Sequence, residues 1–265
     1  MIDNHIHTKL CKHAEGEVYQ YVETAIELGI TELAFTDHIP LPDNFDIAHR
    51  MQMQELDIYT KWISEVRSQY PEIAIRFGIE ADFYEGFERH TELIIKNYDF
   101  DLVIMSVHFL RHWPNGNWVF DYYFPNKSKS EIYSDYIHTI IKGIKTGLFD
   151  VLGHVDMIKS PGDSLVQMIP DEIELLLKTA KHNNMTLEIN TSGFRKKTGE
   201  SYPGLDWIDL IKKIRIPLTV GSDAHTPNQV GLEFNKVYRE LINKGIVSVI
   251  SYKNRRAQEV SVNKE

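Results

Sequence analysis

The stretch DNHIHT, residues 3–8, carries two histidines at the end of the first predicted strand, residues 1–6. Because alternate residues of a strand point to the same face, His5 and His7 project together, and two imidazoles placed in this way can bind one metal ion. The pair alone is a weak signal, since a lone histidine is as often a packed or surface residue. Its weight depends on the residues at the ends of the other strands.

Six further short apolar runs, enriched in β-branched residues, recur along the chain and predict strands. They cover residues 32–36, 73–79, 102–107, 150–153, 185–189 and 217–220. Segments with helical spacing separate them, such as Val18, Val22 and Ala25 before a stop at Gly29. Further helices are predicted over residues 52–69, 85–96, 128–146, 173–180, 205–213 and 230–243. Apolar strands that are each followed by a helix indicate parallel strands buried on both faces.

Polar residues stand at or just beyond the end of every predicted strand. They are His5, His7, Asp37, His38, Glu80, His108, His154, Asn190, Asp223 and His225. A barrel brings all its strand ends together around one mouth, whereas an open doubly wound sheet spreads them along a line. We therefore predict an α/β barrel near the TIM type, as a single domain over residues 1–265. The long loops 40–50, 111–127 and 192–202 are assigned to its mouth.

The composition is that of an ordinary globular protein. Of the 265 residues 42% are hydrophobic and 25% charged, which argues against disorder, collagen and coiled coil. The single Cys11 cannot form an internal disulfide, and no signal peptide or apolar run of ~18 residues appears, so we expect a soluble, cytoplasmic chain without membrane contact. The net charge of −9 does not favour binding to the negatively charged backbone of nucleic acid. An anionic substrate would need positive charge close to its binding site.

Histidines and carboxylates at the predicted mouth are candidate metal ligands. They are His5, His7, His13, His38, Glu80, His108, His154, Asp223 and His225. Such clusters are costly to bury unless they are paired or bind metal. They exceed the ~4 to 6 ligands of one ion, so we predict two to three divalent metals that share a carboxylate, with Glu80 as the bridge. Mixed histidine and carboxylate ligands favour Zn, Fe or Mn over Ca or Mg, and the alternative is an ordinary polar barrel mouth.

Several motifs resemble the polymerase and histidinol phosphatase (PHP) superfamily over nearly the whole chain. They are DNHIHT (3–8), FTDH (35–38), GIEADF (78–83), SVH (106–108), LGHVD (152–156) and GSDAH (221–225). More narrowly, HRMQMQEL (49–56), EINTSGFRK (188–196) and YP (202–203) are similar to the stand-alone L-histidinol-phosphate phosphatase branch of that superfamily.

The resemblance implies a trinuclear metal site in a distorted (β/α)7 barrel. The implied ligand groups are His5, His7, Glu80 and Asp223 for one metal, Glu80, His108 and His154 for a second, and His13, His38 and His225 for a third. Asp37 is expected to orient the ring of His38 by contacting it on the side away from the metal. The alternative is that Asp37 is only a turn residue at the strand end.

A cluster of divalent metals can lower the pKa of a bridging water to near neutrality and neutralise charge on phosphoryl oxygens. We therefore predict a phosphomonoesterase in which a metal-bridging hydroxide attacks phosphorus, with Glu80, Asp223 and His225 as catalytic residues. The resemblance implies L-histidinol phosphate as the substrate, hydrolysed to L-histidinol and phosphate in histidine biosynthesis.

Three basic residues are predicted to bind the substrate. Arg195 is preferred because it comes after the turn at the end of the sixth strand and its planar guanidinium suits bidentate contact with phosphate; Lys159 and Arg50 come next. Candidate partners for the amine and imidazole of the substrate are Asp43, Asp46, Glu85 and Asp121. Aromatic residues after the fourth strand are expected to pack their loop or to form a pocket wall. They are Phe109, Trp113, Trp118, Tyr122 and Tyr123.

Two other functions stay open at this point. One is another PHP-type phosphoesterase, nuclease-like or a broad phosphatase, although the chain has no basic track with interleaved aromatic residues for nucleic acid. The other is a metal-binding partner protein without turnover. The expected partner is a small phosphomonoester rather than nucleic acid or a membrane, and a homo-oligomer is left open.

Overall fold

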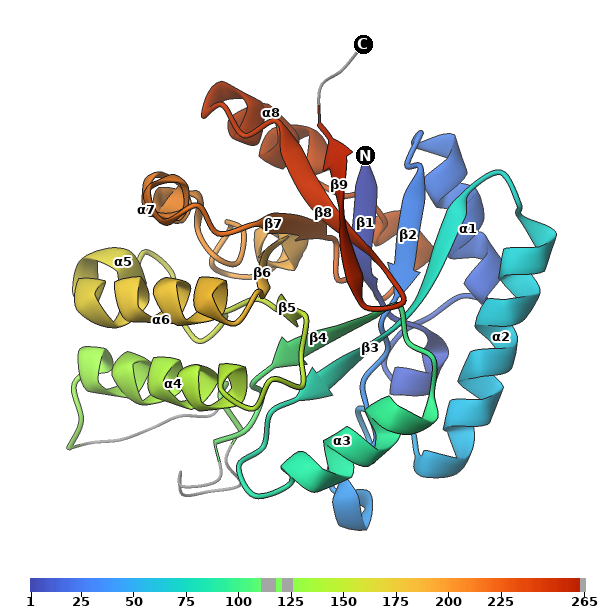
Figure 1. The fold of residues 1–265 in the computed structure, drawn as a ribbon, viewed down its shortest axis with the longest axis horizontal. Coiled ribbons are helices and arrows are strands. Elements are labelled where there is room, and N and C mark those ends of the chain that lie inside the picture. Colours follow the sequence, from blue (N-terminus) through green and yellow to red (C-terminus); the bar gives the residue numbers. More distant parts are fainter. Residues whose placement is uncertain (111–117, 121–125, 263–265) are drawn as a thin grey trace.

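The computed structural model describes residues 1–110, 118–120 and 126–262, and its central sheet has seven parallel strands (Figure 1). They are β1 (Ile2–Ile6), β2 (Glu32–Phe35), β3 (Ala74–Asp82), β4 (Leu102–Ser106), β5 (Val151–Leu152), β6 (Thr186–Asn190) and β7 (Leu218–Gly221). Each strand is hydrogen-bonded to the next one along the chain. Nearly all their residues are buried, as parallel strands covered on both faces require.

The sheet closes into a barrel at the carboxyl ends of its strands. Ile6 forms a parallel bridge with Ala224, and the peptide N–H groups of His7 and Asp223 donate to the carbonyls of Ala224 and His5 at 2.9 and 2.7 Å. The contact thus joins the end of β1 to the residues just after β7, while the two strands are not paired along their length. The fold is the distorted (β/α)7 barrel that the sequence predicts.

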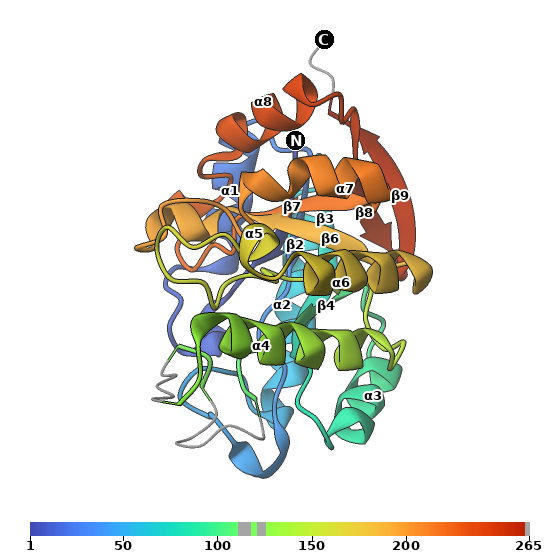
Figure 2. The same ribbon diagram turned by 90° about the vertical axis from the view of Figure 1, so that its left-hand side faces the viewer.

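Helices surround this sheet (Figure 2). They are α1 (Val18–Glu27), α2 (Leu56–Gln69), α3 (Glu88–Asn97), α4 (Lys129–Ile144), α5 (Leu165–Met168), α6 (Pro170–His182), α7 (Ile208–Ile214) and α8 (Phe234–Asn243). Each longer helix turns one apolar stripe inward; α1, for example, buries Val18, Val22 and Ala25 at helical spacing. The short α5 was not predicted. No helix in the described part of the chain has both the length and the apolar character needed to cross a membrane.

A C-terminal hairpin that the sequence did not predict covers the opposite end of the barrel. It consists of β8 (Ser248–Lys253) and β9 (Arg256–Ser261), paired antiparallel and drawn in red in Figure 1. The hydroxyls of Tyr252 and Thr186 are 2.7 Å apart, and the N–H of Asn254 donates to Asp101 at 2.9 Å. Thr186 and Asp101 stand at the amino ends of β6 and β4. The hairpin therefore closes the amino end and leaves the carboxyl end open.

Candidate active site

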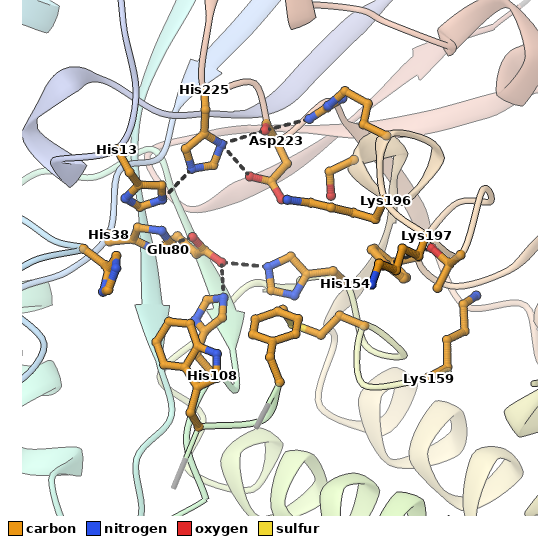
Figure 3. A pocket seen from close by; sticks show the side chains of 18 of the residues that line it. His13, His38, Glu80, His108, His154, Lys159, Lys196, Lys197, Asp223 and His225 are labelled. Carbon is orange, nitrogen blue, oxygen red and sulfur yellow. Dashed lines mark hydrogen bonds and ion pairs between the residues drawn. The ribbon is translucent and has the colours of Figure 1, made fainter. Parts of the chain in front are cut away.

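A cavity of about 750 Å³ opens at the carboxyl ends of the strands (Figure 3). Most of the site residues predicted from the sequence line it: His13, His38, Arg50, Glu80, His108, His154, Lys159, Arg195, Asp223 and His225. His5 and His7 are fully buried and contact Glu80 and Asp223. The loops 40–50 and 192–202 contribute lining residues as expected. In the predicted mouth loop 111–127, residues 111–117 and 121–125 lie outside the described part of the chain.

Glu80 lies at the centre of the histidines. Strand β3 extends past residue 80, and the Glu80 side chain is buried inside the barrel. Its Oε1 lies 2.8 Å from Nε2 of His154 and 3.8 Å from Nε2 of His108. Its Oε2 lies 2.7 Å from Nδ1 of His38. A carboxylate whose two oxygens face different imidazoles is arranged as a bridging ligand would be.

His5, His7 and Asp223 converge beside this carboxylate. The Nε2 atoms of His5 and His7 are 3.1 Å apart, and Nε2 of His7 lies 3.1 Å from Oδ1 of Asp223. Both nitrogens lie 3.5 Å from Oε2 of Glu80. The alternation along β1 thus turns both histidines the same way, and the barrel closure brings Asp223 to them. These four side chains can surround one cation.

His13 and His225 converge at the rim of the cavity. Their Nε2 atoms are 2.9 Å apart, and the ring of His38 stacks on His13 with centroids 5.5 Å apart. Ligand atoms of His7, His38 and His225 lie within 4.8 Å of one another, and so do those of Cys11, His13 and His225. The third predicted group is therefore close together, with His7 and Cys11 as neighbours that the sequence did not assign to it.

Hydrogen bonds on the far side of two of these rings determine which nitrogen is free. Nδ1 of His13 lies 2.7 Å from the carbonyl of Cys11, and Nδ1 of His225 lies 3.0 Å from the carbonyl of Asp223. Because a carbonyl only accepts, each Nδ1 donates and each Nε2 presents a lone pair. Two lone pairs that face each other at 2.9 Å repel unless a cation lies between them. The rim histidines therefore fit a divalent metal ion.

The charge of Glu80 points to the same conclusion. Burial alone would raise its pKa, but the neighbouring imidazoles of His38 and His5 and the hydrogen bond from His154 hold the pKa well below its usual value. Its buried Oε2 accepts no hydrogen bond of good geometry from any residue that the structure describes. An ionised buried oxygen in that position is costly unless a cation compensates it.

Two carboxylates that the sequence analysis did not assign contact the rings of candidate ligands on the side away from the other candidate ligands. Oε1 of Glu188 lies 2.7 Å from Nδ1 of His5, and Oδ1 of Asp82 lies 2.9 Å from Nδ1 of His108. Such contacts fix the tautomer and orientation of a metal-binding histidine. The available signal was an acidic residue inside an otherwise apolar strand, two positions from a strand-end residue on the same face.

Asp37 lies close to a different ring from the one expected. It accepts the peptide N–H of His38 at 2.9 Å, but the imidazole near its Oδ1 is that of His7, with Nδ1 at 3.6 Å. It also accepts the N–H of Thr8 at 3.1 Å, so it holds the end of β1. The expectation for the His38 ring was wrong because consecutive residues of an extended chain point in opposite directions.

The predicted phosphate-binding cations differ in how fully they are paired. Nη2 of Arg195 donates to the carbonyls of Ser222 and Asp223 at 2.8 and 3.0 Å, and its buried Nη1 has no hydrogen-bond partner among the described residues. Nζ of Lys159 lies 2.8 Å from Asp156 and 3.0 Å from Glu200. Arg195 is thus the cation with a donor left for a ligand.

Arg50 is enclosed by acceptors. Its Nη1 donates to Asp82 and to the carbonyl of Ile39, both at 3.0 Å, and its Nε and Nη2 donate to one oxygen of Asp46 at 3.1 and 3.0 Å. Only 2% of the residue is exposed. This geometry favours a role in holding Asp82, and through it His108, over direct contact with phosphate.

The acidic residues suggested for the amine and imidazole are spread out. Asp46 lines the cavity, whereas Asp43 and Glu85 are not among its described lining residues, and Glu85 pairs with Lys142 at 2.9 Å. Asp121 lies outside the described residues, as do Trp113, Tyr122 and Tyr123. Trp118 does line the cavity, as does its neighbour Phe120.

Comparison with known proteins gives sequence relatives over nearly the full length. Residues 3–192 match the sequence profile of the PHP domain family. A protein of Deinococcus radiodurans named "Probable histidinol-phosphatase" is 33% identical over 261 residues, which cover 97% of this chain and 98% of that protein. The histidinol-phosphatase of Bacillus subtilis is 31% identical over 261 residues, covering 88% of this chain and 96% of that protein.

A solved structure shares the fold. The histidinol phosphate phosphatase of Lactococcus lactis, crystallised with zinc, L-histidinol and phosphate, superposes with a TM-score of 0.83 at 21% identity. The match covers 97% of this chain and 98% of that one. The distorted barrel is therefore common to both.

Proposed function

Since the chain belongs to the PHP domain family and is a phosphatase of that family, we propose that it hydrolyses L-histidinol phosphate to L-histidinol and phosphate, a reaction of histidine biosynthesis. The observation that carries the proposal is that the convergent candidate metal ligands and the guanidinium-bearing Arg195 line one cavity. The full-length similarity to two proteins named histidinol-phosphatase supports the choice of substrate.

The ligand groups would hold two to three divalent transition metals, Zn, Fe or Mn. The first group is His5, His7, Glu80 and Asp223, the second Glu80, His108 and His154, and the third His13, His38 and His225. When bound, such ions would supply a hydroxide nucleophile near neutral pH and neutralise charge on phosphoryl oxygens. The zinc in the Lactococcus lactis enzyme supports a transition metal.

The residues of the chain itself attract and orient the phosphate. Arg195 lines the cavity, and its Nη2 donates hydrogen bonds to the carbonyls of Ser222 and Asp223, which hold the guanidinium beside the candidate metal ligands. Lys159 carries a positive charge within the same lining, and its ion pair with Glu200 can exchange for a phosphate oxygen. These local charges would draw in a dianion despite the net charge of −9.

Steady-state kinetics on metal-loaded protein test the proposal. The expected result is a kcat/KM for L-histidinol phosphate that exceeds those of a panel of other phosphomonoesters, together with two to three metal equivalents by elemental analysis. Exhaustive chelation should abolish turnover, and added Zn, Fe or Mn should restore it. Full activity in metal-free protein would contradict a metal-dependent reaction.

The same assays separate the two alternatives. A broad or nuclease-like phosphoesterase would show no preference within the panel, or would cleave and bind nucleic acid with a steep dependence on salt. A metal-binding partner protein would take up the metals and turn over none of the phosphomonoesters.

A further inference from the structure

One wall of the cavity is aromatic and has no part in binding metal or phosphate. It is formed by Trp118 and Phe120, which lie in the connection after β4 and both line the cavity. Phe120 is 52% exposed, a high value for a phenylalanine. Exposing a large apolar ring inside a binding cavity costs free energy that a ligand can recover by covering it.

The segment that carries both rings is anchored to the residues after β4. Val119, between them, is completely buried, and its N–H donates to the carbonyl of His108 at 3.0 Å. Trp118 forms an antiparallel bridge with Phe109. Val119 and Phe120 lie in a turn, and the ring centroids of Trp118 and Phe120 are 5.7 Å apart. With Val119 buried between them, both aromatic residues line the cavity.

Packing supports the wall from behind. The ring of Phe109 meets Trp118 edge to face at 5.0 Å, and Phe45 meets Phe109 at 4.9 Å. Phe109 itself is only 3% exposed. The indole of Trp118 is therefore held in place before any ligand arrives, which lowers the entropic cost of stacking on it.

His49 stands between the wall and the metal ligands. Its ring centroid lies 5.6 Å from Trp118 and 5.7 Å from His13. Its Nδ1 lies 2.6 Å from Oδ1 of Asp46, a contact that makes Nδ1 the donor and leaves Nε2 as an acceptor for an N–H group. The aromatic wall thus has one hydrogen-bonding edge, on the side of the metal ligands.

The cations come from other loops. Lys159 follows β5, and Arg195, Lys196 and Lys197 follow β6; the three lysines are labelled on the right of Figure 3, away from His13 and His38. The cavity therefore offers a cationic part suited to phosphate and an aromatic part suited to a flat ring.

We infer that Trp118 and Phe120, with His49 at their edge, bind the imidazole ring of the substrate and so determine which phosphomonoesters are hydrolysed efficiently. The inference rests on the proposed function, since a substrate with both a phosphate and an imidazole can occupy both parts at once. An imidazole stacks on indole and phenyl faces, and its ring N–H can donate to Nε2 of His49.

The test compares two substrates across matched variants of the metal-loaded protein. For Trp118→Ala and Phe120→Ala, kcat/KM for L-histidinol phosphate should fall about 10- to 30-fold, mainly through KM, while kcat/KM for glycerol phosphate changes less than about twofold. Trp118→Phe should retain most of the preference. Tyr19→Ala removes an exposed aromatic ring of α1 that is not part of the described cavity lining, and it should leave both substrates unchanged.

The outcomes are distinguishable. If Trp118→Ala is poorly folded, Phe120→Ala remains decisive because Phe120 is 52% exposed and its loss disturbs little packing. Suppose that the parent enzyme prefers L-histidinol phosphate. If the variants then lose kcat/KM equally on both substrates, or lose none, the inference is overturned and the proposed function stays intact. A parent enzyme without that preference would overturn both.

Discussion

Oε1 of Glu188 lies 2.7 Å from Nδ1 of His5, and both side chains are buried. The other oxygen of Glu188 accepts the peptide N–H of His154 at 3.0 Å and the side-chain amide of Asn190 at 3.1 Å. One carboxylate on β6 therefore orients the ring of His5, a proposed ligand of the first group, and the backbone of His154, a proposed ligand of the second. It couples two ligand groups from behind their histidines.

Glu188→Gln should weaken metal binding. A glutamine keeps the shape but replaces a charged acceptor by a neutral one, so the tautomer and basicity of His5 are less well fixed, and we expect a loss of about 10- to 100-fold in affinity at the first group. Competition with a coloured chelator measures it. Glu32→Gln is the control, because that carboxylate is buried at the amino end of β2 and bonds Arg76 and Ser251. Unchanged metal affinity in Glu188→Gln would contradict the orienting role.

The sequence predicted the barrel and its mouth because both depend on local periodicity. The alternation in DNHIHT turns His5 and His7 to one face, and the structure has them 3.1 Å apart at Nε2. Polar residues at the ends of apolar runs could be placed together because parallel strands end on the same side. These inferences need no knowledge of side-chain packing.

Other features depend on contacts that sequence spacing does not encode. Arg50 resembled a free mouth cation, but the fold surrounds it with Asp46 and Asp82 from separate segments. The β8–β9 hairpin was missed because its outer strand is largely exposed and lacks an apolar run. The role of Tyr252 follows only from the fold, because its hydroxyl bonds the Asp150 carbonyl before β5 and the Thr186 hydroxyl at the start of β6.

Glu80→Gln should remove more activity than the loss of a ligand at the rim. Its Oε1 lies 2.8 Å from Nε2 of His154 in the second group, and its Oε2 lies 3.5 Å from Nε2 of His5 in the first. The substitution therefore weakens two ligand groups, whereas His13→Ala affects one. We expect kcat/KM to fall about 100-fold or more in Glu80→Gln, with at least one metal equivalent lost. Elemental analysis and kinetics on the same preparations measure this. Full metal content with near-normal turnover would make Glu80 a strand-end acid without a bridging role.

Asp3 should give the fold a measurable dependence on pH. Burial raises its pKa from 3.8 to about 6, although the N–H groups of Ser222 and Gly231 donate to it and oppose the shift. A carboxyl with a raised pKa in the folded state contributes stability that is present below the unfolded pKa and is lost as pH rises through about 6. The free energy of unfolding should therefore fall across that window by up to about 3 kcal/mol relative to Asp3→Asn.

The measurement is urea unfolding of both proteins at several pH values with a chelator present. The histidine ligands titrate in both proteins and cancel in the difference, so only the Asp3 contribution remains. A difference between the two proteins that is constant between about pH 4 and pH 7 would show that the Asp3 carboxyl titrates normally.

Arg195 should bind the substrate phosphate through its free Nη1. Its Nη2 is held by the carbonyls of Ser222 and Asp223, and burial lowers the pKa of the guanidinium without neutralising it, since arginine stays charged at neutral pH. Arg195→Met keeps the length and removes the guanidinium with all its donors. Losing a charge-assisted contact should cost ~2 to 4 kcal/mol in kcat/KM, roughly 30- to 1000-fold.

Two further variants separate phosphate binding by Arg195 from its hydrogen bonds to the loop that carries Asp223. Arg195→Lys retains the charge but cannot contact carbonyl and phosphate through a planar fork, so it should recover only part of the loss. Lys61→Met removes an exposed charge of α2 that is not part of the described cavity lining, and it should change kcat/KM less than about threefold. Metal content should stay at the parent value in all three, because the N–H of Asp223 is still held by the carbonyl of His5 at 2.7 Å.

A raised KM alone would mean equal contact in ground and transition states, and a lowered kcat would mean a contact that strengthens during transfer. Arg195→Met with intact metals and kcat/KM within about threefold of the parent would leave Arg195 with only its structural bonds to Ser222 and Asp223.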